Sequence, residues 1–313
     1  MKPARRIAIL GEPDAAARCT RALAGEGQVV RTTADPDELL ALLERGEADE
    51  AALCNPEAGL GRQLELADAA LRAGADVALL RPAVPHGIAG LGLIRKHAGR
   101  EPLLFLPARR ITPRLPLVKR LFDVVFSAAV LLLGLPAWLF VAAAIKLQDG
   151  GPVFFVQDRV GAGGRHFRFV KFRTMAPGAD AHHANFEAEH REDGHLFKLR
   201  DDPRRTAVGR VLRRFSLDEV PQFLHALAGQ MSVVGPRPPL PFEVERYEPW
   251  QHLRLRGWVG LTGLWQVCGR SEIRDLNDIA LLDALYLHNH SPLLDLRIVL
   301  RTVHVILSRR GAY

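Results

Sequence analysis

Residues 124–145, VVFSAAVLLLGLPAWLFVAAAI, form an apolar run of 22 residues that contains no charge. A helix rises about 1.5 Å per residue, so one of this length would cross the roughly 30 Å core of a bilayer. Pro136 lies in the middle, where it removes a helical hydrogen bond and predicts a kink. Basic residues flank both ends, so the positive-inside rule gives no direction. The run predicts a straight transmembrane helix, a helix that bends at Pro136 and returns, or a core helix of a soluble protein.

The sequence before this run alternates short apolar stretches with helical patterns. Such repetition predicts an α/β fold with a parallel, doubly wound sheet. The segment PARRITPRLPLV, residues 107–118, is rich in proline and arginine, as domain boundaries often are. We therefore predict a Rossmann-like domain over residues 1–112 and a second domain over residues 113–313. The expected strands are Ile7–Leu10, Gln28–Thr32, Glu50–Cys54, Asp76–Leu80 and Leu103–Leu106, and the expected helices lie near Ala15–Gly25, Pro36–Arg45 and Gly61–Gly74.

The first turn of this domain departs from a dinucleotide-binding loop. Gly11 opens the turn, but Pro13 stands where a second glycine would admit a pyrophosphate, and proline has no N–H to donate. The favoured interpretation is a domain that regulates or pairs chains. A nicotinamide-dependent enzyme is the alternative, and a cofactor-induced thermal shift would reveal it.

Composition indicates the class of partner. The net charge of +7 and the sequence pI of about 9.8 predict lipid headgroups, a phosphorylated substrate or nucleic acid. No zinc-finger spacing and no basic platform with aromatic residues is present, so we expect no nucleic-acid partner. Cys19, Cys54 and Cys268 are far apart and odd in number, which predicts reduced thiols without a disulfide or metal framework. No signal peptide is recognisable at the N-terminus.

Residues 293–307 have the pattern of an amphipathic helix. One stripe is apolar, and a second carries Arg297, Arg301 and His304. A helix with a basic face suits the headgroup layer of a membrane, and packing on the protein's own domain is the alternative. The apolar stripe consists of Leu296, Val299, Leu300, Val303 and Leu307.

The chemistry is concentrated in residues 213–221, RRFSLDEVP. Ser216 and Glu219 have the spacing of a capping box, and Asp218 would favour the same helix dipole, so a purely structural interpretation exists. Two arginines that stand a few residues before two carboxylates favour another interpretation. Adjacent carboxylates can hold a divalent cation and present one oxygen as a nucleophile, and a helix N-terminus would attract phosphate.

A second motif follows at residues 234–239, VGPRPP. Pro236 and Pro238 flank Arg237 and fix the backbone on both sides of it. A rigidly aimed arginine suits bidentate recognition of phosphate, whereas the alternative is an exposed arginine on a proline-rich turn.

More cations precede the dyad, because KFRTM supplies Lys171 and Arg173, and Arg159 lies upstream. The three glycines within residues 161–164 are not followed by the Lys-Ser/Thr of a P-loop, so they predict a hairpin turn. Four further histidines lack the spacing of a zinc site and predict a solvated segment. They are His182, His183, His190 and His195.

Seven motifs stand in series from about Pro116 to Tyr313. In chain order they are KRLFDVVFSAAVLLLGLP, GPVFFVQDRVG, KFRTM, LFKLRDDPR, VGRVLRRFSLDEVPQ, MSVVGPRP and GLTGLWQVCGR. In content and order they resemble the bacterial sugar transferases, the monotopic polyprenyl-phosphate phosphoglycosyltransferases. The resemblance is to the large members that initiate exopolysaccharide, capsule or O-antigen synthesis, although those usually carry an N-terminal bundle of four transmembrane helices that is missing here. It implies an α-rich monotopic catalytic domain with a re-entrant helix over about residues 119–147, broken at Pro136.

The resemblance also implies roles for residues. Asp218 would attack the β-phosphate of a UDP-sugar, release UMP and pass the sugar phosphate to polyprenyl (undecaprenyl) phosphate in ping-pong order. Glu219 would hold Mg²⁺ together with Asp218, or move a proton. Arg213 would orient Asp218. The implied substrate-binding residues are Arg213, Arg237, Pro236, Pro238, Lys171, Arg173 and Arg270.

A cytosolic nucleotide sugar argues for a helix that returns at Pro136, because both halves then stay on the cytoplasmic face of the bacterial inner membrane. The expected partners are the UDP-sugar, polyprenyl phosphate and membrane lipid, and the first domain suggests a homodimer. The alternative function is a non-catalytic membrane-associated regulatory or assembly protein that keeps the fold. The intact pair Asp218 and Glu219 argues against that alternative.

Overall fold

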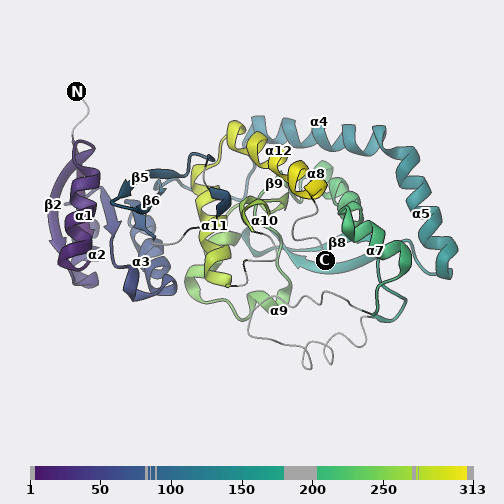
Figure 1. Ribbon diagram of the computed structural model, residues 1–313, viewed down its shortest axis with the longest axis horizontal. Coiled ribbons are helices and arrows are strands. Elements are labelled where there is room, and N and C mark those ends of the chain that lie inside the picture. Colours follow the sequence, from purple (N-terminus) through teal and green to yellow (C-terminus); the bar gives the residue numbers. More distant parts are fainter. Residues whose placement is uncertain are drawn as a thin grey trace. The chain divides into compact units, whose positions relative to one another are not determined.

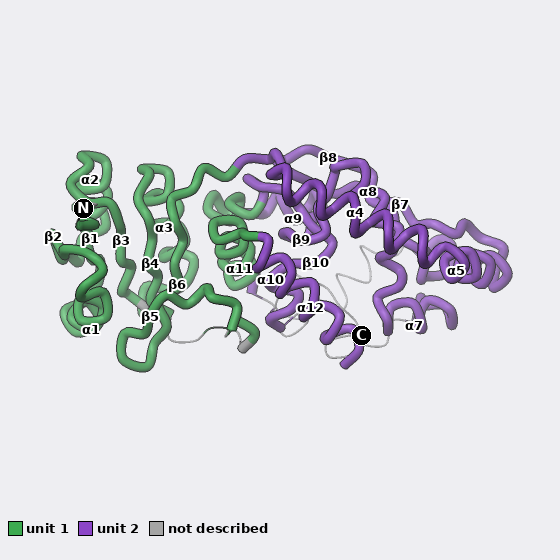
Figure 2. Tube along the Cα trace, turned by 90° about the horizontal axis from the view of Figure 1, so that it is seen from above, with its two compact units in different colours: residues 1–111, 248–254, 277–291 green, residues 112–247, 255–276, 292–313 purple. Residues whose placement is uncertain are grey.

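In the computed structural model the chain forms two compact units (Figure 2). Unit 1 takes two short segments from the second half of the chain. Unit 1 comprises residues 1–111, 248–254 and 277–291, and unit 2 comprises residues 112–247, 255–276 and 292–313. The structure describes residues 4–81, 84, 86–88, 90–179, 203–269, 273 and 275–308.

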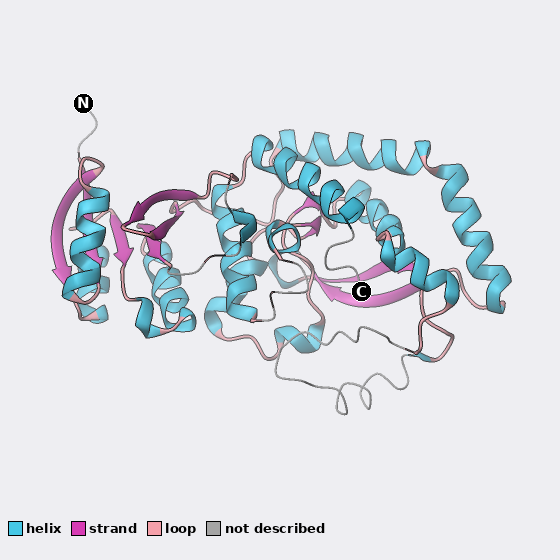
Figure 3. Ribbon diagram, in the orientation of Figure 1, coloured by secondary structure: helices cyan, strands magenta, loops and turns pink. Residues whose placement is uncertain are grey.

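Unit 1 is a mixed α/β structure (Figure 3). It is built on a six-stranded sheet with the order β2-β1-β3-β4-β6-β5. The first four strands are parallel, as predicted, but β6 runs antiparallel to β4, and β5 antiparallel to β6. The expected parallel direction is therefore wrong for the predicted strand Leu103–Leu106, and β5 was not predicted. A short turn with no crossover helix joins β5 to β6, so that pair closes as a hairpin. The strands are β1 (Arg5–Leu10), β2 (Gly27–Thr33), β3 (Glu50–Leu53), β4 (Asp76–Leu80), β5 (Ile94–Ala98) and β6 (Glu101–Leu106).

Helices cover both faces of this sheet, because right-handed crossovers place α1 (Pro13–Leu23) opposite α2 (Pro36–Glu44) and α3 (Leu60–Arg72). The inner face of α1 consists of Ala15, Ala16, Cys19 and Leu23, all buried. They pack against alternate residues of the strands, including Ile7 and Ile9. This helix has an apolar face toward the core and a polar face outward, as the sequence pattern predicts.

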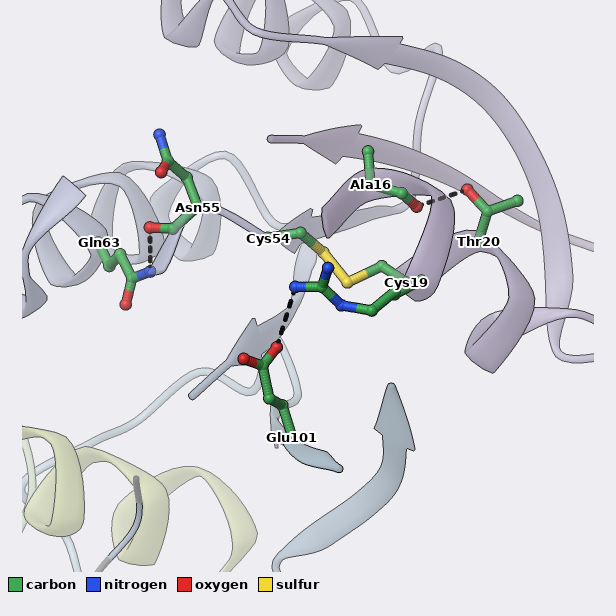
Figure 4. The surroundings of a disulfide bond; sticks show 8 residues. Ala16, Cys19, Thr20, Cys54, Asn55, Gln63 and Glu101 are labelled. Carbon is green, nitrogen blue, oxygen red and sulfur yellow. Dashed lines mark hydrogen bonds and ion pairs between the residues drawn. A yellow bond between two sulfur atoms is a disulfide. The ribbon is translucent and has the colours of Figure 1, made fainter. Parts of the chain in front are cut away.

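The core under α1 contains a disulfide between Cys19 and Cys54 (Figure 4). The two residues are 35 positions apart, but their Cα atoms lie 6.7 Å apart, within the usual range for a disulfide. The expectation of reduced thiols is therefore wrong for this pair. The crossover from β1 through α1 to β2 and back to β3 lays α1 over the end of β3, which spacing in the sequence does not show. Cys268 is free and buried.

The lone glycine of the first turn is explained by the same close packing. A Cβ atom at Gly11 would lie 2.5 Å from the Cys54 carbonyl oxygen, well inside contact distance. Glycine is required here because two backbones meet. No pyrophosphate is needed to account for it.

The later segment of unit 1 contains α11 (Leu276–Asn289). Asn289 Nδ2 donates to the Phe105 carbonyl at 2.7 Å, which ties the end of the helix to β6. Inside the unit, the guanidinium of Arg254 pairs with Asp283 at 2.8 Å, and both side chains are buried. Helix α11 is thus part of the structure built on the first sheet.

In unit 2, the apolar run folds as two helices, α4 (Leu117–Leu133) and α5 (Leu135–Asp149), with a bend of 63° between them (Figure 1). No single helix among the described residues is long and apolar enough to cross a membrane, although this bent pair together meets that test of length and composition. A straight transmembrane helix is therefore wrong. Pro136 lies in the first turn of α5, where its missing N–H costs least.

The bend itself rests on Gly134 and Trp138. A Cβ atom at Gly134 would lie 2.3 Å from the Trp138 ring, so only glycine lets the indole fold back. Trp138 Nε1 then donates to the Val130 carbonyl at 3.1 Å, across the break. The angle is thereby held by a specific contact as well as by the proline.

Helix α4 has its polar side chains inside. Lys119, Asp123 and Ser127, spaced four residues apart, are its buried residues. Lys119 Nζ pairs with Asp295 Oδ2 at 2.7 Å. Asp123 Oδ1 accepts hydrogen bonds from Ser232 Oγ at 3.0 Å and from the Val233 N–H at 2.9 Å. The apolar side chains point outward: Leu117, Val118, Leu121, Val125, Leu132 and Leu133 are exposed.

Helix α12 (Pro292–Ser308) is tied to α4 by Asp295 and buries Leu294 and Ile298. Four members of its predicted apolar stripe are exposed instead of packed on the protein. They are Leu296, Leu300, Val303 and Leu307.

The rest of unit 2 surrounds an antiparallel hairpin of β7 (Phe154–Val160) and β8 (His166–Phe172), which the glycine spacing predicts. A parallel pair, β9 (Ser232–Val234) and β10 (Gly260–Thr262), lies nearby. Phe169 and Phe172 of β8 belong to two separate apolar cores, so this strand contributes to both. The remaining helices are α7 (Ala207–Arg214), α8 (Phe223–Ala228), α9 (Pro241–Val244) and α10 (Leu264–Cys268).

Candidate active site

The dyad Asp218–Glu219 lies on a 3-10 helix, Leu217–Gln222, directly after α7. Ser216 links the two helices with a φ of 55° and makes no side-chain capping bond. The capping-box interpretation is therefore wrong: the backbone of Ser216 is left-handed, whereas a capping residue is extended. Among the described residues it is the one non-glycine with positive φ, a conformation that costs about 1–3 kcal/mol and often marks a functional site.

Asp218 is buried, 8% exposed, beside a second carboxylate. Burial, and next the charge of Glu219, raise the pKa of Asp218, while Lys171, Arg213 and Arg237 oppose that rise. The geometry therefore places one buried carboxyl group within the field of three cations. Such a group is a good nucleophile once its proton has left.

Lys171 reaches the dyad from β8, the strand that packs on the 3-10 helix. Burial lowers the pKa of Lys171 to about 8; Asp218 opposes this shift, and the nearby arginines add to it. The ammonium also lies 4.9 Å from the centre of the Phe155 ring. The structure thus brings the predicted Lys171 to the predicted nucleophile.

Arg213 and Arg237, from two other elements, are the other two cations near Asp218. Arg213, at the end of α7, donates from Nε to Thr174 Oγ1 at 2.9 Å. Arg237 Nη1 pairs with Glu219 Oε1 at 2.8 Å. Glu219 and Asp218 together raise the pKa of Arg237, against its burial. Side chains from positions 171, 213 and 237 of the chain therefore converge on the dyad.

The loop that carries Arg237 is held by its proline carbonyls. The Gly260 N–H donates to the Pro236 carbonyl at 2.7 Å, and the Val160 N–H donates to the Pro239 carbonyl at 2.9 Å. Arg159 Nη1 donates to the Pro238 carbonyl at 3.0 Å. In the sequence, Arg159 is recognisable only as a further cation upstream of the dyad. Its hydrogen bond to the loop joins two residues that are 79 positions apart in the sequence.

Two predicted substrate-binding residues differ from this group. Arg173 pairs with Asp149 at the end of α5, and further donates to the carbonyls of Pro152 and Met175. The structure therefore connects Arg173 to α5 rather than to the dyad. Arg270 lies outside the described residues, as do the four histidines His182, His183, His190 and His195.

The described residues contain no cluster of three or more His, Cys, Asp or Glu side chains that could hold a metal ion. The dyad alone offers two adjacent carboxylates, one of them already paired with Arg237. Mg²⁺ often takes one or two carboxylates and completes its shell with water and substrate phosphates. The donor set fits a magnesium ion that arrives with a phosphorylated substrate.

Residues 115–309 match the bacterial sugar transferase family, and the chain belongs to it. It is 41% identical over 196 residues to the galactosyl transferase CpsE of Streptococcus agalactiae, covering 63% of this chain and 43% of that protein. It is 41% identical over 199 residues to the exopolysaccharide production protein ExoY of Sinorhizobium fredii, covering 62% and 88%. Over 203 residues it is 39% identical to the undecaprenyl-phosphate galactose phosphotransferase of Salmonella typhimurium, covering 63% and 42%. The chain thus spans less than half of two of these relatives and most of ExoY.

Proposed function

We propose that this protein transfers a sugar 1-phosphate from a UDP-sugar to undecaprenyl phosphate and so initiates exopolysaccharide, capsule or O-antigen synthesis. The observation that carries the proposal is the Asp218–Glu219 dyad, in which Asp218 is buried and lies within the field of Lys171, Arg213 and Arg237. A nucleophile surrounded by cations suits attack on a diphosphate, whose charge would otherwise repel a carboxylate. The names of the relatives agree with this class of reaction.

The reaction has two displacement steps. A carboxylate oxygen of Asp218 attacks the β-phosphorus of the UDP-sugar, the bond from that phosphorus to the bridging oxygen breaks, and UMP leaves. Asp218 then carries the sugar phosphate as an acyl phosphate. An oxygen of undecaprenyl phosphate attacks the same phosphorus, the bond to Asp218 breaks, and the carboxylate is regenerated. Two products released in turn from one nucleophile predict ping-pong kinetics.

Each cation has a part in this scheme. Arg237 is fixed by its loop and reaches the dyad from the side of Glu219, so it binds the nucleotide phosphates. Lys171 and Arg213 lie within the field of Asp218 and favour its ionised form. Mg²⁺, held by Asp218 and Glu219 with the substrate phosphates, would neutralise charge on the departing UMP.

The membrane is proposed as the site of action because α4 buries polar side chains and exposes apolar ones. Helix α4 buries Lys119, Asp123 and Ser127 against the protein and exposes its leucines. This arrangement is expected of a helix that has protein on one side and lipid on the other. Helices α4 and α5 would enter the bilayer and return at the 63° bend, as a monotopic re-entrant pair. The exposed stripe of α12 would lie in the headgroup layer. A soluble UDP-sugar donor supports a site at the cytoplasmic face of the inner membrane.

The sheet of unit 1 is proposed to serve as a Rossmann-like domain that pairs two chains. Gly11 is explained by packing on Cys54, so this domain has no remaining sign of a dinucleotide loop. A membrane preparation in detergent should sediment as a homodimer. A monomer across the working concentration range would exclude this role.

The decisive experiment is UMP release by the full chain in detergent with Mg²⁺ and a panel of UDP-sugars. We expect one or a few sugars to support release, and Asp218→Asn to abolish it together with any trapped phosphosugar adduct. Arg168→Gln, a change at an exposed position of β8, is the matched control and should remain active. Full activity of Asp218→Asn would exclude the covalent mechanism.

A further inference from the structure

Arg159 lies at the end of β7 and connects the hairpin with the loop that carries Arg237. Its Nη1 donates to the Pro238 carbonyl at 3.0 Å, and its Nη2 donates to Gln157 Oε1 at 3.2 Å. The next residue, Val160, donates its N–H to the Pro239 carbonyl at 2.9 Å. Two consecutive residues of one strand therefore hold two consecutive carbonyls of the loop.

The loop depends on such outside donors because prolines cannot supply their own. Residues 236–239, PRPP, contain three prolines, so Arg237 has the one backbone N–H of this stretch. The loop cannot extend the sheet as a regular strand, and its carbonyls must accept from elsewhere. On the other side the Gly260 N–H holds Pro236. The direction of the Arg237 side chain is thus set by contacts on both sides of it.

The guanidinium of Arg159 packs on a buried aromatic ring. Its guanidinium lies 5.3 Å from the centre of the Phe169 ring, and Phe169 is 1% exposed. That ring stacks on His225, whose Nε2 accepts the N–H of Val170 at 3.0 Å. A planar cation on a buried ring loses little entropy when it makes a directed hydrogen bond.

Arg159 also lies within the electrostatic field of the site. Burial, and next the charge of Arg237, lower the pKa of Arg159 to about 10, while Glu243 and Glu219 oppose this shift. Arg159 therefore stays charged at neutral pH, close to a second arginine. Like charges repel, so hydrogen-bond acceptors are needed to keep both guanidinium groups in fixed directions.

We propose that Arg159 is a positioning residue for the Arg237 loop: by holding the Pro238 carbonyl it aims Arg237 at Glu219 and at the diphosphate of the donor. The part of this statement that concerns the donor rests on the proposed function. Arg159 needs no contact with substrate for this role. Its effect passes through Arg237.

A double-mutant cycle in the full chain tests this role. UMP release is measured for wild type, Arg159→Gln, Arg237→Gln and the double variant. We expect Arg159→Gln to lower kcat/KM for the UDP-sugar by about 10²-fold, since displacement of a positioned group by about 1 Å costs that much. In the Arg237→Gln background the same change should cost less than about threefold, because residues that act as a unit are not additive. Equal factors in both backgrounds overturn the proposal.

Two measurements exclude a merely structural effect. The melting temperature of Arg159→Gln should stay within a few degrees of that of Arg168→Gln, the exposed control on the same hairpin. Arg159→Lys keeps the charge but not the planar fork, so its kcat/KM should fall between those of wild type and Arg159→Gln. A loss of activity that parallels a large loss of melting temperature overturns the proposal.

Failure of the inference is distinct from failure of the proposed function. A wild-type chain that releases UMP while Arg159→Gln does so equally well excludes only the positioning role. A wild-type chain that releases no UMP and shows no thermal shift with UDP excludes the proposed function itself.

Discussion

Helices α1 and α4 share one helical period, but α1 buries an apolar face and α4 a polar one. The buried residues of α1 are Ala15, Ala16, Cys19 and Leu23, whereas those of α4 are Lys119, Asp123 and Ser127. A helix places residues four apart on one side whatever their chemistry. The chemistry of the outer side then indicates the surroundings: polar for α1, and for α4 the leucines and valines that we assign to lipid. The comparison shows that a polar stripe in an apolar helix marks the protein-facing side.

The largest expected effect comes from breaking the inner contact of α4. Lys119 and Asp295 pair at 2.7 Å, and their side chains are 4% and 7% exposed. Removing one partner leaves a buried charge, so Lys119→Met should lower the free energy of unfolding by about 3–5 kcal/mol. Denaturant unfolding in detergent measures it. The double variant Lys119→Met/Asp295→Leu should recover most of the loss; no recovery would show that the pair contributes more than charge balance.

A matched pair of leucines sharpens the comparison. Leu23 in α1 is 1% exposed, and Leu133 in α4 is 85% exposed. Leu23→Ala should cost about 2–5 kcal/mol through the cavity that it leaves. Leu133→Ala should stay within about 0.5 kcal/mol in detergent, and should weaken binding to vesicles instead. Equal losses of stability would mean that the outer side of α4 packs on protein.

Charges are also buried differently in the two regions. In unit 1, Arg95 has a carboxylate partner, Glu50, at 2.7 Å, while Lys171 of unit 2 lies among cations as well as beside Asp218. The pKa of Lys171 is lowered to about 8, so it loses its charge as the pH rises through that value. We expect kcat/KM to fall about tenfold per pH unit above 8, and to fall again at low pH as Asp218 is protonated.

Stability should move the other way over the same range. The folded-state pKa of Lys171 lies below its ordinary value, so between about pH 8 and that ordinary value the unfolded chain binds more protons at this residue than the folded chain does. The free energy of unfolding therefore rises with pH over this range, because the cost of burying the ammonium group is lost. Activity and melting temperature measured together from pH 7 to 10 check this. Parallel losses of both would attribute the decline in activity to unfolding.

The smallest effect is expected at Ser216, the left-handed residue before the dyad. Within a regular helix such as α4, a change from serine to glycine would weaken the helix, but at a φ of 55° glycine relieves strain. Ser216→Gly should raise the unfolding free energy by up to about 1 kcal/mol and lower UMP release through a looser dyad. Ser216→Val should destabilise the fold, because β-branched residues avoid this region.

Much of the fold follows from local patterns. The first four strands of unit 1 were predictable because a parallel sheet buried on both faces has apolar strands between helices. The glycines before β8 predicted the hairpin. The reversal of β5 and β6, the disulfide of Cys19 with Cys54, and the inclusion of α11 in unit 1 were not predictable. Each depends on which distant segments meet.

The candidate active site divides in the same way. The sequence by itself determined the family, the dyad Asp218–Glu219, the flanking prolines of Arg237 and an apolar run interrupted by Pro136. These are local properties: residue type, spacing and backbone restriction.

Only the tertiary structure decided that Ser216 does not cap a helix, that Arg173 holds Asp149, and that Arg159 holds the Arg237 loop. It alone showed which side of α4 is buried. The physical reason is that hydrogen bonds and burial depend on neighbours in space. A guanidinium or a serine has the same donors wherever it stands, and its partners come from strands and loops that the sequence places far away.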